Sequence, residues 1–109
     1  MFLSEPVHFV AQVETLVDTA SVRLSGELDI AKLPELRFAM QDARASGCQR
    51  IVLDLRGLEF IDSIGVTELL RIAHEERIAG RTVEYLCAPG DVTRTLDLMR
   101  VSTLLPLAA

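Results

Sequence analysis

The sequence IVLDLRGLEFIDSIGVTELL, residues 51–70, decides the fold because a strand pattern changes into a helix pattern within it. Its first part, together with Arg50, is RIVLDLRGL (50–58), a nearly continuous apolar run that is typical of a strand in the middle of a sheet. From Ser63 onward the apolar residues recur at helical spacings of three and four, at Val66, Leu69, Leu70 and Ala73. We therefore expect a central strand that leads directly into a helix.

The segments on either side of this stretch also alternate between strand and helix patterns. Two β-prone segments come first, and a helix pattern with Pro34 near its start and Gly47 at its end follows them. A further strand and helix come after Gly80. The predicted order is β-β-α-β-α-β-α, an α/β fold with a mixed, partly parallel sheet of about four strands and three main helices. The predicted elements around the central pair are residues 7–17, 21–28, 29–47, 81–88 and 89–101, with core positions Leu33, Leu36, Met40, Val92, Leu96 and Met99.

Length and composition favour a single domain in a reducing compartment. The chain has 109 residues, half of them hydrophobic, and no repeat or long linker, so we expect one domain over 1–109 with its core at about 7–105. Cys48 and Cys87 lack a Cys-x-x-Cys spacing and are predicted to be buried, reduced thiols. We expect a cytoplasmic protein, because no signal peptide and no apolar run of ~20 residues is present.

The charge of the chain argues against one class of partner. Eleven Lys and Arg residues face sixteen Asp and Glu residues, which gives a net charge of −5 and a pI near 4.9. An acidic domain with so few aromatic residues is a poor match for the phosphate backbone and the bases of nucleic acids. Direct nucleic-acid binding is therefore not expected.

Asp62 and Ser63 lie where the central strand ends and its helix begins, which is where sites gather in open α/β sheets. Either side chain could cap the helix, since both are preferred N-cap residues. Gly65 costs about 1 kcal/mol relative to alanine in a first helical turn, which suggests a close approach to the backbone. Ile64 beside it fits a partner surface or a contact inside the fold equally well.

Modification of the Ser63 hydroxyl is a second interpretation of this junction. A phosphate there meets free N–H groups at the positive end of the helix dipole, so the fold tolerates it. The phosphate adds about −1.5 to −2 charges near Asp62, Glu59 and Asp29, on a chain that is already acidic. A partner docked at this junction would therefore be sensitive to the modification.

The chain resembles the STAS domain family, and within it the stand-alone bacterial antagonists of anti-sigma factors. The resemblance covers nearly the whole chain and rests on three segments: VRLSGELDIAKLPELR (22–37), IVLDLRGLEFIDSIGVTELL (51–70) and GRTVEYLCAPGDVTRTLDLMRVSTLLPL (80–107). It implies a protein without catalytic activity whose partner is an anti-sigma factor that is also a serine kinase. The unphosphorylated form would bind this partner, phosphorylation of Ser63 would release it, and a serine phosphatase would restore binding.

The resemblance also implies roles for residues around Ser63. Asp29 and Asp62 match acidic positions that present the serine to the kinase, and Gly26 and Gly65 match glycines that shape the turn and the helix start. The docking face would further include three positions at which this chain departs from the commonest pattern: Ile64, Thr67 and Glu68.

Enzymatic interpretations have less support. A Ser-His-Asp site is not expected, because His74 follows Ser63 by eleven residues, about 16 Å along a helix. His8 and His74 are predicted to be surface residues, and with the two cysteines they form no zinc spacing. No phosphate-binding loop is present. We therefore expect no catalytic residues, no metal and no cofactor.

Two other functions remain open at this point. The first is a constitutive structural STAS module of a sensory or transport-associated complex, with Ser63 only as a helix cap. The second is a small protein that binds a ligand or a nucleotide at the same helix N-terminus. The sequence leaves the oligomeric state undetermined.

Overall fold

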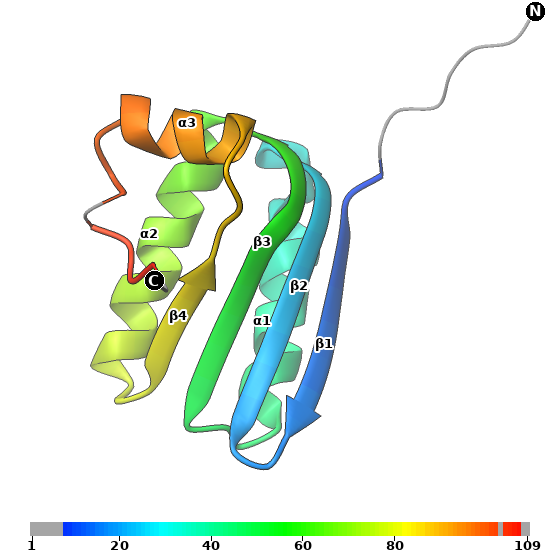
Figure 1. The fold of residues 1–109 in the computed structure, drawn as a ribbon. Helices are drawn as coiled ribbons and strands as arrows, with labels where there is room; N and C mark the ends of the chain where they lie inside the picture. Colours follow the sequence, from blue (N-terminus) through cyan, green and yellow to red (C-terminus); the bar gives the residue numbers. More distant parts are fainter. Residues whose placement is uncertain (1–7, 103, 108–109) are drawn as a thin grey trace, which may run out of the picture.

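The computed structural model describes residues 8–102 and 104–107, and its elements follow the predicted order β-β-α-β-α-β-α, with a short 3-10 helix added before the first α-helix (Figure 1). The elements are β1 (Val10–Leu16), β2 (Thr19–Leu28), η1 (Ile30–Lys32), α1 (Leu33–Ala45), β3 (Arg50–Ile61), α2 (Ser63–Ile78), β4 (Thr82–Leu86) and α3 (Asp91–Leu98).

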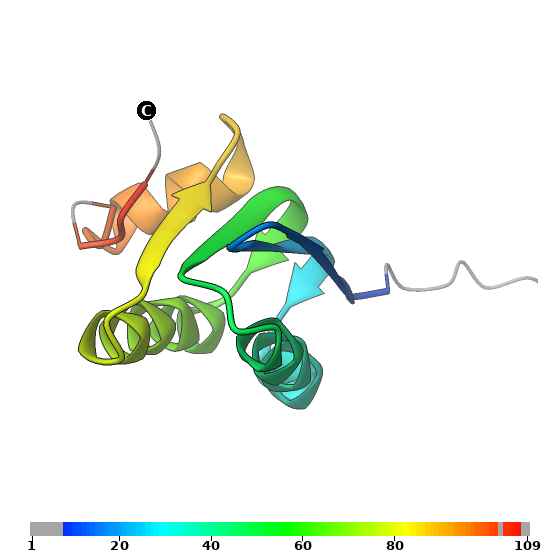
Figure 2. The same ribbon diagram turned by 90° about the horizontal axis from the view of Figure 1, so that it is seen from below.

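The four strands form one mixed sheet in the order β1-β2-β3-β4. β1 pairs with β2 in the antiparallel sense, whereas β2, β3 and β4 run parallel, as expected for strands joined through helices. α1 and α2 lie side by side against one face of the sheet (Figure 2), and α3 crosses the end at which the parallel strands finish (Figure 1). The predicted mixed, partly parallel sheet is therefore confirmed.

The core lies between the sheet and the two long helices and is almost entirely aliphatic. Alternate residues of β2 and β3 point into it, as the period of two requires, and meet the apolar stripes of α1 and α2. The aromatic members of the core are Phe9 and Tyr85, and the buried Tyr85 hydroxyl donates a hydrogen bond to the carbonyl oxygen of Leu69. The largest fully buried side chains of the core include Leu24, Leu28, Leu36, Met40, Ile51, Leu53, Leu55, Ile61, Leu69, Ile72 and Leu96.

Several sequence predictions need correction. β3 continues to Ile61, because after Gly57 the chain keeps pairing with β2 through an irregular register. Of the predicted stripe of α2, Val66 and Leu69 are fully buried, whereas Leu70 and Ala73 are only partly buried and Ile72 takes a core position in their place. Met99 is 38% exposed because α3 ends at Leu98, so it lies outside the core.

Two buried carboxylates join α1 to α2, and the sequence pattern did not reveal them. Glu76 on α2 is 1% exposed and accepts hydrogen bonds from Arg44 Nε on α1 at 2.9 Å and from Arg81 Nε at 2.6 Å. Burial alone would raise the pKa of Glu76, but these two arginines lower it below its usual range. Glu68, two turns earlier on α2, makes the second link, with Arg37 of α1.

Candidate functional site

The junction between β3 and α2 is fixed by backbone pairing and by one carboxylate. The Asp62 N–H donates to the carbonyl oxygen of Leu28 at 3.2 Å, which holds the ends of β2 and β3 together. Asp62 has extended backbone angles and its Oδ1 accepts a hydrogen bond from the Gly65 N–H at 2.8 Å. Of the two predicted cap residues, Asp62 is therefore the one that caps α2.

Ser63 is the first residue of α2, and its side chain is exposed. Its hydroxyl makes no hydrogen bond to any other residue that the structure describes. Thr67, one turn later, is also exposed, and its hydroxyl donates to the Ser63 carbonyl oxygen at 2.9 Å. The two hydroxyl groups therefore share one face of α2, with that of Ser63 available from solvent.

Asp29 lies beside this junction, because β2 and β3 are parallel and Leu28 pairs with Ile61 at their ends. Its Oδ1 accepts a hydrogen bond from the Ala31 N–H at 3.0 Å and lies 3.7 Å from Lys32 Nζ. Both predicted acidic residues are thus half-buried caps at the same end of the sheet, Asp29 of η1 and Asp62 of α2, and they flank the position of Ser63.

The two glycines that the sequence singled out have packing roles inside the fold. A Cβ on Gly65 would lie 2.9 Å from the Leu28 carbonyl oxygen and 2.8 Å from Ile61 Cγ1, so the close approach at this helix start comes from the ends of β2 and β3. Gly26 has φ +93°, and a Cβ there would overlap the carbonyl oxygen of His8. Both positions are therefore restricted by the chain itself.

Apolar side chains are exposed on the segments that meet at this junction. Ile64 is 40% exposed, Ile30 of η1 is 62% exposed and Phe60 near the end of β3 is 48% exposed. Sequence reasoning identified only Ile64, because a single apolar residue beside a turn carries no signal of its exposure. We call the following residues the α2-start surface: Asp29, Ile30, Phe60, Asp62, Ser63, Ile64 and Thr67.

The prediction that Glu68 lies on this surface is wrong. Its side chain is 3% exposed and accepts hydrogen bonds from Arg37 Nη2 at 3.0 Å and Arg71 Nε at 3.1 Å. Burial would raise the pKa of Glu68, but the hydrogen bonds from Arg71 and Arg37 lower it to about 2. This carboxylate is turned toward α1 and holds the helix that carries Ser63.

The remaining candidate groups lie apart from the α2-start surface. His8 and His74 are exposed, as predicted. Cys48 is a buried free thiol and Cys87 is free but only half-buried, with its pKa raised by burial and by the charge of Asp54. Within residues 8–102 and 104–107 no cluster of three or more His, Cys, Asp or Glu side chains is arranged to hold a metal ion. No described helix combines the length and apolar character that crossing a bilayer requires.

Comparison with known proteins agrees with this architecture. Residues 11–106 match the family model described as MlaB, STAS domain. An anti-sigma F factor antagonist of Lysinibacillus sphaericus is 37% identical over 79 residues, which cover 71% of this chain and 67% of the relative.

Solved structures with the same fold carry related names. An anti-sigma factor antagonist from Mycobacterium paratuberculosis superposes with a TM-score of 0.79 at 26% identity, over 96% of this chain and 89% of the other. The anti-sigma factor antagonist SpoIIAA in its unphosphorylated form gives 0.72 at 22% identity, over 92% and 89%. SpoIIAA in the phosphorylated form gives 0.65 at 24%, over 92% of each chain. From the family match and the shared fold it follows that this chain belongs to the STAS domain family.

Proposed function

We propose that the chain is an anti-sigma factor antagonist and that phosphorylation of Ser63 controls its binding to the anti-sigma factor. One observation carries the proposal: the Ser63 hydroxyl is exposed and free of hydrogen bonds to the described residues, while Asp62 does the capping. A serine kept only as a cap would accept an N–H at the helix start. The names of the relatives, and the phosphorylated form of one of them, support this assignment.

In the unphosphorylated form, the α2-start surface supplies the contact area. Ile30, Phe60 and Ile64 expose apolar side chains on the segments that meet at Ser63, which suits the apolar centre of a protein interface. Asp29 and Asp62 flank the serine and would orient it toward the active site of a partner that is also a serine kinase. In this proposal the chain acts in the cytoplasm and catalyses nothing, and the partner supplies ATP.

Phosphorylation would release the partner through charge and desolvation alone. The phosphate adds about −1.5 to −2 charges next to the carboxylates of Asp29 and Asp62. A hundredfold loss of affinity requires about 2.7 kcal/mol, which repulsion and the burial of a charged group in an interface can supply. The N-terminus of α2 tolerates the same charge, so the fold need not change, and a serine phosphatase would reverse the modification.

Phosphosite mapping by mass spectrometry tests the proposal directly. The full chain is recovered from its native cells during growth, starvation and stress, beside Ser63→Ala and Thr67→Ala variants. We expect phosphate on Ser63 in the unmodified chain and in Thr67→Ala, and none in Ser63→Ala. The adjacent hydroxyl of Thr67 thus serves as the matched control.

The same preparations report on the partner. Ser63→Ala should retain a kinase-type anti-sigma factor under every condition, whereas the unmodified chain should lose it when phosphorylated. Ser63 that stays unmodified under all three conditions would remove the switch and favour a constitutive STAS module instead.

A further inference from the structure

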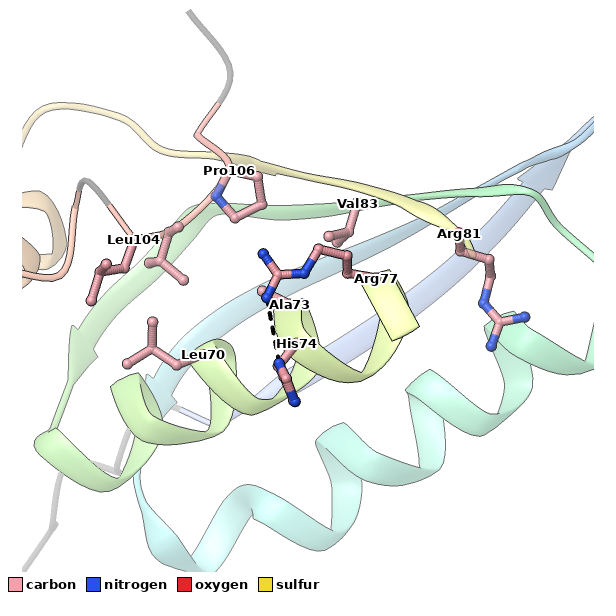
Figure 3. A pocket seen from close by; sticks show the side chains of 9 residues that line it. Leu70, Ala73, His74, Arg77, Arg81, Val83, Leu104 and Pro106 are labelled. Atoms are coloured by element: carbon pink, nitrogen blue, oxygen red, sulfur yellow. Dashed lines mark hydrogen bonds between the residues drawn. The ribbon is translucent and has the colours of Figure 1, made fainter. Parts of the chain in front are cut away.

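A pocket of about 350 Å³ lies at the other end of α2, between that helix, β4 and the C-terminal segment. Figure 3 shows Leu70 of α2 opposite Leu104 of the C-terminal segment, with Pro106 and Val83 of β4 across from Ala73, whereas the His74 ring points away from the C-terminal segment. The volume falls within the range of small-molecule sites. Three separate segments of the chain therefore build one hollow, to whose wall aliphatic side chains and the polar groups of arginine and histidine contribute about equally.

The cationic groups at this pocket differ in how they are used. Arg81 is bound to Glu76, with its Nε 2.6 Å from the carboxylate. Arg77 forms no ion pair with any described carboxylate, and its one hydrogen-bond contact in that part of the chain is His74 Nδ1 at 3.5 Å. In Figure 3 its side chain extends between His74 and Pro106. On a chain with a net charge of −5, one unneutralised guanidinium thus borders a hollow that also has an aliphatic part.

The favourable interaction of Arg77 with the helix dipole of α2 explains only part of this arrangement. Arg77 lies in the last turn of α2, where a positive charge is favourable. That role requires no apolar hollow beneath the side chain and no second segment facing it. The combination of aliphatic side chains on one part of the wall with an unpaired cation on another suits a ligand with an apolar body and an anionic head.

We propose that this pocket binds a small amphipathic carboxylate, with its head on Arg77 and its short aliphatic body against Leu70, Val83 and Leu104. The site is distinct from the α2-start surface, because His74 lies eleven residues from Ser63, about 16 Å along the helix. The proposal therefore stands independently of the phosphorylation switch.

Octanoate is a suitable probe. Methyl NMR of the full chain with labelled Leu and Val residues reports where octanoate binds. We expect saturable shifts of the Leu70, Val83 and Leu104 methyl signals, with the Val22 and Leu24 signals on β2 unchanged. Octanol has the same aliphatic body without the charge and should bind more weakly. Equal binding of octanol, or shifts that never saturate, would overturn the proposal.

Two variants separate the charge from the cavity. Arg77→Gln should weaken octanoate binding about fivefold, the factor given by ~1 kcal/mol for an exposed ion pair. Arg94→Gln, which alters an exposed arginine paired with Asp91 on α3, is the matched control and should bind normally. Ala73→Met fills the hollow but keeps the positive charges of Arg77 and Arg81, so it should abolish octanoate binding. Retained affinity in either Arg77→Gln or Ala73→Met would contradict the assignment.

Discussion

Replacing Glu68 by glutamine removes the buried charge that joins the start of α2 to α1. The carboxylate is 3% exposed and its pKa lies at about 2, against an ordinary value of 4.5. That difference corresponds to about 3 kcal/mol of folding free energy at neutral pH. Because the side chains of Arg37 and Arg71 are 52% and 39% exposed, solvent screening reduces the expected loss to about 2 kcal/mol.

The pH dependence of this loss follows from the direction of the shift. The pKa of Glu68 is lower in the folded state than in the unfolded state, so its contribution is complete above about pH 5. It is lost progressively as the pH falls toward 2. The free-energy difference between the unmodified chain and Glu68→Gln should therefore be largest at pH 7 and roughly halved by pH 3.

Urea unfolding followed by circular dichroism at pH 7, 5, 4 and 3 measures this difference. Glu75→Gln is the matched control, because Glu75 is exposed and pairs with the same Arg71 at 2.6 Å. Its loss should be at most about 0.5 kcal/mol. A difference for Glu68→Gln that does not change with pH, or a control that is equally destabilised, would refute the assigned role of the buried pair.

Three further substitutions test the geometry described above. Gly65→Ala should lower the free energy of unfolding, measured by urea titration, by about 1–3 kcal/mol, because the new Cβ would lie 2.9 Å from the Leu28 carbonyl oxygen. Unchanged stability would contradict this packing. Val17 has φ 57° and is 97% exposed. Because asparagine adopts this left-handed conformation more readily than valine, Val17→Asn should stabilise the fold by about 1 kcal/mol and raise the Tm. A lower Tm would show that the Val17 side chain makes a needed contact. At low salt, Ser63→Glu should stabilise α2 by about 0.3–1 kcal/mol, whereas Ser63→Lys should destabilise it. A higher Tm for Ser63→Lys than for Ser63→Glu would show that the helix start does not accept negative charge.

Much of the fold was predictable because periodicity is a local property. The change from a nearly continuous apolar run to apolar spacings of three and four around Ser63 located β3 and the start of α2, and the same reasoning gave the order of all main elements. The length of β3 was missed because Gly57 and Glu59 interrupt the apolar run, although the backbone continues to pair with β2.

The site was only partly predictable because pairing between helices is a tertiary property. Glu68 and Glu76 look like members of a solvated helix face until Arg37 and Arg44, more than thirty residues upstream, are placed opposite them. Gly65 did indicate a close approach, but only the structure identifies Leu28 as the group that approaches.

The contact between the C-terminal segment and β4 also protects the sheet. The Tyr85 N–H donates to the Pro106 carbonyl oxygen at 2.9 Å, and Tyr85 pairs with Leu107 in an isolated parallel bridge. The outer edge of β4 is thereby partly occupied by the chain's own backbone, which is one of the ways proteins prevent intermolecular strand addition. A truncation before Leu104 would uncover these groups beside the apolar side chain of Val83. Aggregation through β4 would then compete with folding, so a tag is better added after this segment than in place of it.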